Sequence, residues 1–337
     1  MTNREPRTPP VPILLVPKDG LKTLDTLLAV RQAHDITGTI YAVDFYVDSA
    51  ERWEPAPGGW RHPTHPIVNV DHHAPHASMQ RKVSSANLAL DLIHADTKPD
   101  PGDAVVISHI DCDSILSAGI LSGRLDAKAV YGEAAIAADH TGVEHGIADL
   151  LQGLDAHWSR KKRDTPTLET IEYLFACLER LEDGEAVEKV DDFARDSIEG
   201  RKKSRAQAEG IARTRMEANR NVYFAQLTQD EGPIEGELFL PHLPDAWIVA
   251  TASPHSDHDN RWQWRIRLGN AAPGWLSLHD LGMGTFDPVF GGRWNAGSNN
   301  RPPEKDGDRA LPGSTLSPEE YRDRLVEALD ARLLEHA

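Results

Sequence analysis

Cysteine is almost absent from this chain, which has only Cys112 and Cys177 among 337 residues. Two thiols cannot form a disulfide framework, so disulfide-rich secreted folds are excluded and we expect a reducing compartment. Long apolar runs are also missing, since no stretch approaches the roughly 18 residues of a membrane span. The first residues lack the apolar core of a signal peptide. We therefore expect a cytoplasmic protein with no membrane partner.

Positive charge is scarce as well. The chain has 36 Lys and Arg against 53 Asp and Glu, which gives a formal charge of −17. This balance argues against a protein that coats long duplex nucleic acid or anionic membrane, because both require a basic face. A composition of 39% hydrophobic and 26% charged residues excludes an intrinsically disordered chain. The acidity suits a protein that concentrates cations.

Short apolar strands alternate with helices through the first part of the chain. We predict helices at 21–34, 85–93 and 115–125, and strands at 12–16, 39–43, 67–70, 104–107 and 127–131. This alternation is typical of a parallel sheet that is covered by helices on both faces.

The second half of the sequence has a different pattern. Only helical periodicity is found from about 156 to 220, and after it strands are predicted at 222–227, 247–252 and 262–268. Clusters of Gly, Pro, Asn and Asp between these strands predict an antiparallel sheet. The segment 317–320 is a capping box that begins the last helix. We thus predict an α/β fold with a parallel-sheet domain at 1–155, a helical linker at 156–220 and a smaller α+β domain at 221–337.

The sharpest local pattern follows the fourth predicted strand. His109, Asp111 and Asp113 come at steps of two, and an extended segment would point all three side chains the same way. They would lie at the carboxyl end of a parallel strand, where open α/β sheets bind their ligands. Imidazole and carboxylate groups suit Mn²⁺ or Mg²⁺, whereas Cys112 points away on this spacing. The alternative is that Asp113 or Ser114 caps the following helix.

A second pattern follows the strand at 67–70. Asp71, His72 and His73 come directly after it. Successive side chains of a strand diverge, so one histidine would bind a metal ion and the other would face a substrate phosphate. The alternative is a loop that is merely rich in histidine, because the neighbouring residues include His62, His65 and His76.

Two further aspartates follow strand-like runs. Asp44 ends the run at 39–43, with Asp48 as a competitor four residues on, and Asp139 ends the run at 134–138. Taken singly, either is equally well explained as a turn or cap residue. Together with the two motifs they predict a carboxylate-rich rim on one sheet, which would repel itself unless cations bridged it.

These short motifs resemble those of the DHH phosphoesterase superfamily, which includes RecJ-type exonucleases, nanoRNases, cyclic-dinucleotide phosphodiesterases and manganese pyrophosphatases. The resemblance implies two Mn²⁺ ions, with Mg²⁺ as an alternative. It implies a bridging Asp44, one ion held by His109 and Asp111, and a second held by Asp113, His72 and Asp139. It also implies that Asp71 orients His72 and that His73 contacts phosphate. Asp71, His73 and Asp113 would be the catalytic residues.

The order of the motifs differs from that of the family. The His-x-Asp-x-Asp motif normally precedes Asp-His-His, whereas here it begins at His109, after Asp71. A circular permutation of the sheet is the simplest explanation, since closely placed surface termini can be joined and new ends opened in a loop. Ser114 stands where the family often has glycine. Ser84 and Ser85 are also family-like, although capping of a helix explains them as well.

The segment 290–298 is similar to the glycine-rich substrate-binding loop of the DHHA1 domain, the family's common partner domain. Its candidate substrate-binding residues are Gly291, Gly292, Arg293 and Asn295. Adjacent glycines let backbone N–H groups approach a phosphate closely, and an arginine adds a bidentate anion donor. A plain glycine turn is the alternative.

One predicted strand of the second domain carries a basic stripe. Alternation in 261–268 places Trp262, Trp264, Ile266 and Leu268 on one face, and Gln263, Arg261, Arg265 and Arg267 on the other. This stripe would bind a few backbone phosphates, or it would simply be the solvated face of the strand.

Two dications about 3.5–4 Å apart can activate a water and stabilise a leaving oxygen, so the predicted function is metal-dependent phosphoester hydrolysis. We favour a nuclease-like enzyme that cleaves phosphodiester bonds of nucleic acid or short oligonucleotides. The first alternative is a phosphatase of a small nucleotide, such as a 3′,5′-bisphosphate nucleotide or a cyclic dinucleotide, or of pyrophosphate or polyphosphate. The second alternative is a non-catalytic nucleotide-binding protein. The oligomeric state is open, with a homodimer as one option.

Overall fold

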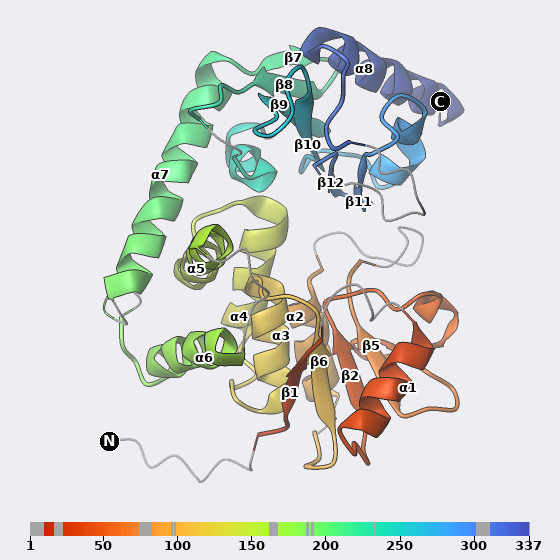
Figure 1. Ribbon diagram of the computed structural model, residues 1–337, viewed down its shortest axis with the longest axis vertical. Helices are drawn as coiled ribbons and strands as arrows, with labels where there is room; N and C mark the ends of the chain where they lie inside the picture. The colour runs from red at the N-terminus through yellow and green to blue at the C-terminus, as the bar shows by residue number, and fades with distance from the viewer. Residues whose placement is uncertain are drawn as a thin grey trace. The chain divides into compact units, whose positions relative to one another are not determined.

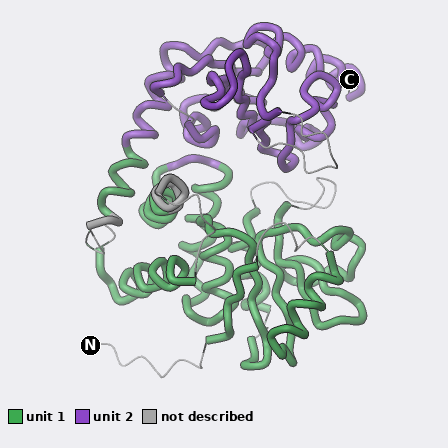
Figure 2. Tube along the Cα trace, in the orientation of Figure 1, with its two compact units in different colours: residues 1–140, 144–202 green, residues 141–143, 203–337 purple. Residues whose placement is uncertain are grey.

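The computed structural model describes residues 10–16, 23–73, 83–95, 97, 99–161, 168–186, 189, 192–231, 234–300 and 311–336. The chain forms two compact units (Figure 2). Unit 1 comprises residues 1–140 and 144–202, and unit 2 comprises residues 141–143 and 203–337. Each unit has a six-stranded sheet, which confirms the predicted α/β class.

The sheet of unit 1 has the strand order β1-β6-β2-β5-β4-β3. Its parallel part contains β1 (Ile13–Leu15), β6 (Ala104–Ile107), β2 (Ile40–Val43) and β5 (Ile67–Val70). These are four of the five predicted strands. The sheet is parallel as predicted in these four strands, but β4 (Gly59–Arg61) and β3 (Glu54–Ala56) add an antiparallel hairpin at one edge that was not predicted. These three-residue edge strands are partly exposed and have no apolar run that sequence patterning could detect.

Helices cover both faces of this sheet (Figure 1). On one face α1 (Leu24–Ala33) packs against alternate strand residues, which include Ile40, Ala42, Ala104 and Val106. On the other face α2 (Ser85–His94) and α3 (Cys112–Ser122) pack against the intervening residues, which include Tyr41, Val43, Val105 and Ile107. The two-residue period of each strand therefore places one apolar set in each of the two cores.

The fifth predicted strand is a helix. Residues 127–131 were predicted as a strand, but α4 (Ala129–Ile136) begins there and continues into a π-helix over Ala137–Thr141. The strand-like run at 134–138 is helical as well. Alanine is the commonest residue from Ala127 to Ala138, and it has the highest intrinsic helix propensity.

Helices fill most of the stretch at 156–220 as predicted, as α5 (Gly146–Lys161), α6 (Leu168–Glu182) and α7 (Asp192–Thr214). The prediction was wrong at its end, where Glu217–Asn219 form a strand. The division between the units falls within α7. Side chains of α6 join the core of unit 1, so the part of the predicted linker up to residue 202 belongs to that unit. The roles of the units as catalytic and substrate-binding domains stay predictions. Among the described residues, no helix has the length and apolarity needed to cross a membrane.

The sheet of unit 2 has the order β11-β12-β10-β9-β8-β7. Its strands are β7 (Glu217–Asn219), β8 (Val222–Gln226), β9 (Ile248–Pro254), β10 (Trp262–Leu268), β11 (Gly291–Arg293) and β12 (Ala296–Ser298). The prediction of an antiparallel sheet was wrong at one pair, because β8 and β9 are parallel. A parallel pair needs a long crossover, and the segment that contains the 3₁₀-helix Gly236–His242 supplies it.

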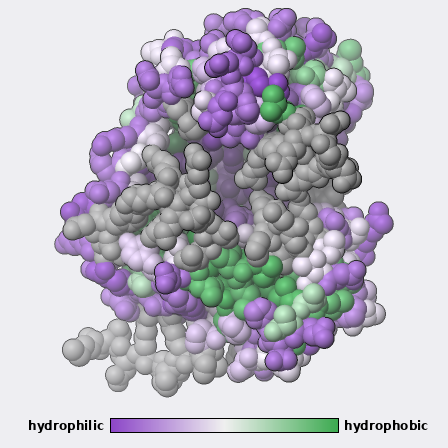
Figure 3. Space-filling model, viewed as in Figure 1, coloured by the Kyte–Doolittle hydropathy of each residue, from purple (hydrophilic) through white to green (hydrophobic). Residues whose placement is uncertain are grey.

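One core of unit 2 lies between its sheet and α8 (Pro318–Glu335), and a second contains residues of α7, β8, β9 and the 3₁₀-helix Gly236–His242. As predicted, Ser317 forms a capping box with Glu320 at the start of this helix. The rings of Trp264 and Tyr321 stack in the core with centroids 3.9 Å apart. On the face seen in Figure 3, unit 2 is covered mainly by hydrophilic residues, whereas a hydrophobic patch lies on unit 1.

Candidate metal centre

The carboxyl ends of three adjacent parallel strands carry the candidate ligands. Asp44 follows β2, Asp71–His73 follow β5, and His109 comes two residues after β6. Because these strands are neighbours in the sheet, their ends meet at one edge. The possible ligand atoms form three groups, and the atoms within each group lie within 4.8 Å of one another. The groups are Asp44–His72–His73, His72–Asp139–His140 and Asp44–His109–Asp111.

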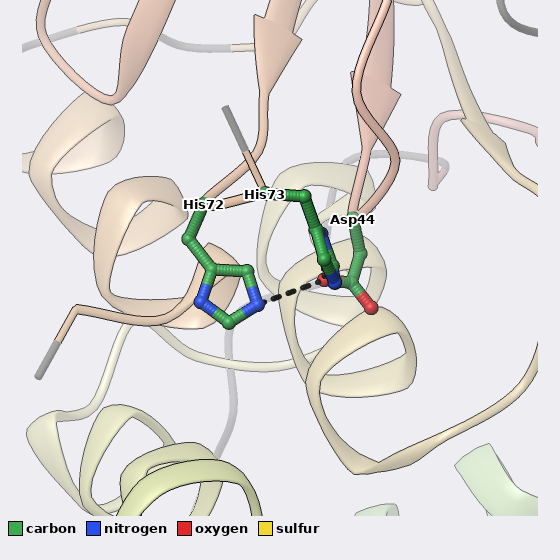
Figure 4. Close-up of side chains that lie close together, drawn as sticks. All are labelled: Asp44, His72 and His73. Atoms are coloured by element: carbon green, nitrogen blue, oxygen red, sulfur yellow. Dashed lines mark ion pairs between the residues drawn. The ribbon is translucent and has the colours of Figure 1, made fainter. Parts of the chain in front are cut away.

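Asp44 belongs to two of these groups. Its Oδ2 is 3.2 Å from Nε2 of His109, and its Oδ1 is 3.6 Å from Nε2 of His72. The ring of His72 points toward Asp44, with His73 beside it (Figure 4). The carboxylate is buried, and its Oδ2 receives no hydrogen bond from the described residues. Asp48, the competing residue, is exposed to solvent.

The His109 side of the site is held by the start of α3. Nε2 of His109 is 3.0 Å from Oδ2 of Asp111, and its Nδ1 is 2.9 Å from Oγ of Ser108. Asp111 is the N-cap of α3 and accepts a hydrogen bond from the amide of Ser114. Oγ of Ser114 accepts in return from the amide of Asp111, so this serine completes a capping box. The alternative interpretation of this motif had Asp113 or Ser114 as the cap, whereas the observed cap is Asp111.

Asp113 does not lie on an extended segment, as its spacing from His109 predicted. The helix begins at Cys112, three residues before the predicted start, so Asp113 lies in its first turn. Its two carboxylate oxygens accept hydrogen bonds of 2.7 Å from the amides of Ser85 and Ala86 at the start of α2. Oδ2 is also 3.4 Å from Nε2 of His72. The predicted ligand and catalytic roles of Asp113 stay predictions, beside an observed role in holding α2.

The serines that open α2 have separate roles. Ser84 is the N-cap and forms a capping box with Asn87, which confirms the capping interpretation. Oγ of Ser85 donates to Oδ1 of Asp44 at 2.9 Å. The hydroxyl thus links α2 to the carboxylate at the centre of the site.

A backbone carbonyl orients His72. Nδ1 of His72 is 2.8 Å from the carbonyl oxygen of Val83, and since a carbonyl can only accept, Nδ1 carries the hydrogen. This leaves Nε2 as the nitrogen that can face a metal ion, and it lies 3.2 Å from Oδ2 of Asp139. We expected Asp71 to orient His72. Oxygens of Asp71 lie 2.5 Å from Nδ1 and 2.9 Å from the backbone nitrogen of His73, and the orienting of His72 by Asp71 stays a prediction.

The π-helix adds a histidine that we did not predict. Asp139 and His140 both lie in it, and His140 joins the ligand group of His72 and Asp139. Nε2 of His140 is 2.9 Å from the carbonyl oxygen of Val83, which His72 also contacts. Single π-turns are rare and are found frequently at functional sites. No periodicity in the sequence signals this turn.

The crowded carboxylates perturb one another. Burial, together with the charge of Asp111, raises the pKa of Asp44 to about 6. Burial and the charge of Asp44 raise the pKa of Asp113 to about 8. Burial opposes the charge of His109, but the carboxylates of Asp111 and Asp44 outweigh it and raise its pKa well above the ordinary value. Two dications would keep all the carboxylates ionised.

The donor set fits hard or borderline dications. It combines carboxylate oxygens with imidazole nitrogens, and the buried Oδ2 of Asp44 still lacks a hydrogen-bond donor among the described residues. Cys112 contributes no thiolate, because it is buried in the core of unit 1 with its Sγ directed at the carbonyl of Ala134. The site therefore resembles a manganese or magnesium centre more than a cysteine-ligated zinc site.

The glycine-rich segment of unit 2 is a hairpin. Gly291, Gly292 and Arg293 form β11, and Asn295 lies in the turn before β12. A Cβ atom on Gly292 would lie 2.3 Å from the carbonyl oxygen of Ala296, so this position requires glycine. The requirement is explained by packing within the hairpin. The predicted substrate contacts of Gly291, Gly292, Arg293 and Asn295 stay predictions.

The three arginines of the basic stripe have different environments. Arg261 donates to the backbone carbonyls of residues 311–313, and Arg267 is buried in an ion pair of 3.2 Å with Glu237. Nε of Arg265 is buried and has no hydrogen-bond acceptor among the described residues. Burial lowers the pKa of Arg265. The stripe is therefore not a continuous phosphate track.

No family model matches the chain, and no curated protein matches it. A solved structure that is similar to it is the pGpG-specific phosphodiesterase PggH from Vibrio cholerae, with 11% sequence identity over 73% of this chain and 88% of that chain, and a TM-score of 0.43. A similarity at this score supports no functional assignment. The function is therefore inferred from the geometry of the site.

Proposed function

We propose that this chain is a metal-dependent phosphoesterase of the DHH type, with its metal centre at the strand ends of unit 1. The observation that carries the proposal is the position of Asp44, whose two oxygens face two separate ligand groups. A carboxylate shared between two sites is what a two-metal phosphoesterase needs. Circular permutation stays our explanation for the order of the motifs.

Together these ligand groups would hold two ions. His109 and Asp111 would hold the first, and His72 and Asp139, assisted by Asp113, would hold the second, with Asp44 shared between them. When bound, such a pair of ions supplies an activated water and neutralises developing charge on the phosphoryl oxygens. We propose Mn²⁺ as the ion, with Mg²⁺ as an alternative, because the donors are oxygen and imidazole nitrogen.

The two adjacent histidines differ in solvent exposure, as a buried metal ligand and a residue that contacts substrate should. The side chain of His72 is 2% exposed, whereas that of His73 is 28% exposed. His73 can therefore meet a substrate phosphate. Asp71 accepts from Nδ1 of His73 and favours the positively charged ring, whose Nε2 would then donate a hydrogen bond to the phosphate. We propose that Asp71 acts through His73, as a positioning residue.

The environment of the basic stripe favours a small substrate. Two of its three arginines are already engaged with carbonyls or Glu237, whereas Nε of Arg265 has no acceptor among the described residues. A long polymer needs several phosphate contacts, and the chain has a charge of −17. We propose that the substrate is a short oligonucleotide or dinucleotide, which unit 2 binds through Arg265 and the glycine hairpin. A small-nucleotide phosphatase is the second candidate.

A substrate panel tests the proposal. Metal-stripped protein is given Mn²⁺ or a chelator together with short RNA and DNA, a linear and a cyclic dinucleotide, a 3′,5′-bisphosphate nucleotide or pyrophosphate. We expect Mn²⁺-dependent release of mononucleotides, fastest from the shortest substrates. Release of inorganic phosphate would identify the phosphatase instead. Failure to turn over any substrate with Mn²⁺ bound would leave only a non-catalytic nucleotide-binding protein.

A further inference from the structure

A polar side chain interrupts the apolar strand that precedes the Asp-His-His motif. Asn69 lies in β5 between Val68 and Val70, and its relative exposure is 0%. An amide at such a position is unfavourable unless its hydrogen bonds are satisfied inside the protein. The contacts of this side chain therefore indicate what it does.

Among the described residues, the hydrogen bonds of the Asn69 amide all go to the end of β2 and the segment that follows it. Its Nδ2 donates to the carbonyl oxygens of Ala42 at 3.1 Å and Phe45 at 2.9 Å. Its Oδ1 accepts from the amide of Val47 at 3.1 Å. These three backbone groups lie on both sides of Asp44, so one side chain holds the segment before and after that residue.

The segment needs such support, because Asp44 has a left-handed backbone conformation. Its φ is +58°, which non-glycine residues rarely adopt unless the surroundings impose it. The backbone amide of Asp44 donates to the carbonyl of Val70, the residue directly before the Asp-His-His motif. This conformation directs the carboxylate between His109 and His72, so a change of backbone would move both of its oxygens.

We propose that Asn69 is a positioning residue that fixes the carboxylate of Asp44 between the two metal-ligand groups. It touches neither set of ligand atoms and acts only through the backbone of residues 42–47. The inference rests on the proposed function, since it assigns Asn69 to the same metal centre. It predicts that the loss of this amide lowers metal affinity, and that a variant with a similar loss of folding stability elsewhere keeps its metal affinity.

Asn299 provides a matched control in unit 2. Its relative exposure is also 0%, its Oδ1 accepts from the amide of Trp264, and its Nδ2 donates to Asp287 and to the carbonyl of Trp262. Asn69→Leu and Asn299→Leu thus each remove three hydrogen bonds made by a fully buried side chain. Only the first variant removes support from Asp44.

The experiment is a calorimetric titration of metal-stripped full-length protein with Mn²⁺, with the melting temperature measured on the same samples. We expect Asn69→Leu to weaken Mn²⁺ binding by about 10–100-fold, as changes to residues behind metal ligands do, and Asn299→Leu to leave it unchanged. If Asn69→Leu does not fold, Asn69→Ser, which is smaller and admits water, takes its place. Equal Mn²⁺ affinity in wild type and Asn69 variants would overturn the inference alone. Absence of Mn²⁺ binding by the wild type would overturn the proposed function as well.

Discussion

The ring of His72 is fixed by the carbonyl of Val83, which lies 2.8 Å from its Nδ1. This contact leaves Nε2 as the ligand atom, facing three carboxylates at 3.2–3.6 Å. His72→Phe removes the nitrogen but keeps an aromatic ring of similar size. We expect the number of bound Mn²⁺ ions to fall from two to one, as measured by calorimetry. A variant that still binds two ions would show that His72 is not a ligand.

Asp44→Asn tests the shared ligand. The amide keeps the shape of the side chain, but it has one oxygen in place of two and no charge. We expect turnover of the best panel substrate to fall by about 10²-fold or more, because both ligand groups lose their common member. Asp48→Asn is the control, since Asp48 is exposed and only four residues away. Equal rates for the two variants would contradict the bridging role.

Asp113→Asn tests the link between the site and α2. The amides of Ser85 and Ala86 both donate to the carboxylate, and an asparagine side chain can accept from only one of them. We expect the metal-free protein to lose about 1–3 kcal/mol of unfolding free energy, which is the usual effect of an unsatisfied buried donor. Urea denaturation in the presence of chelator measures this loss. Unchanged stability would mean that the two bonds do not form.

The raised carboxyl pKa values predict how stability depends on pH without metal. Asp44 and Asp113 have pKa values of about 6 and about 8 in the folded chain, above the ordinary range near 4. The folded state therefore holds protons that the unfolded state has released, and stability falls as pH rises from about 4 to about 8. His109, whose pKa is also raised, contributes in the same direction.

Thermal denaturation in chelator should therefore show a melting temperature that falls between about pH 5.5 and about pH 8. Saturating Mn²⁺ should reduce or reverse this slope, because the ion replaces the protons on the carboxylates. Asp113→Asn should flatten its upper part, since it removes the group with the higher pKa. A melting temperature that rises with pH in chelator would contradict the assignment.

Arg265→Gln tests substrate binding by unit 2. If the guanidinium holds a phosphate that is not cleaved, its loss should raise KM about 10-fold with little change in kcat, since such a contact is equal in the ground and transition states. Arg322→Gln is a suitable control, because Arg322 pairs with Glu217 and Asp323 on the surface. A lower kcat with an unchanged KM would place Arg265 outside the substrate site.

The strand ends could be predicted because the residues change abruptly there from apolar to ionisable. Apolar runs end directly before Asp44 and Asp71, and close before His109, so the sequence shows both the strands and the groups that they present. Burial of strands on both faces leaves a continuous apolar signal. The parallel part of the sheet and the side chains gathered at its edge are predictable from this signal.

Other features depend on tertiary contacts and have no local signal. The π-turn that brings in His140 looks like an alanine-rich strand or helix, and Asn69 looks like a single break in an apolar run. The pairing of Asp71 with His73 depends on how the chain leaves β5. Asp113 lies at the site as the spacing predicted, but it does so from the first turn of a helix and not from an extended segment.

The most direct test of the two-metal centre is anomalous X-ray scattering from crystals of the full chain grown with Mn²⁺. We predict two manganese peaks on opposite sides of the Asp44 carboxylate, one next to His109 and Asp111 and the other next to His72 and Asp139. Manganese peaks found only elsewhere, or a single peak that does not involve Asp44, would contradict the two-metal centre.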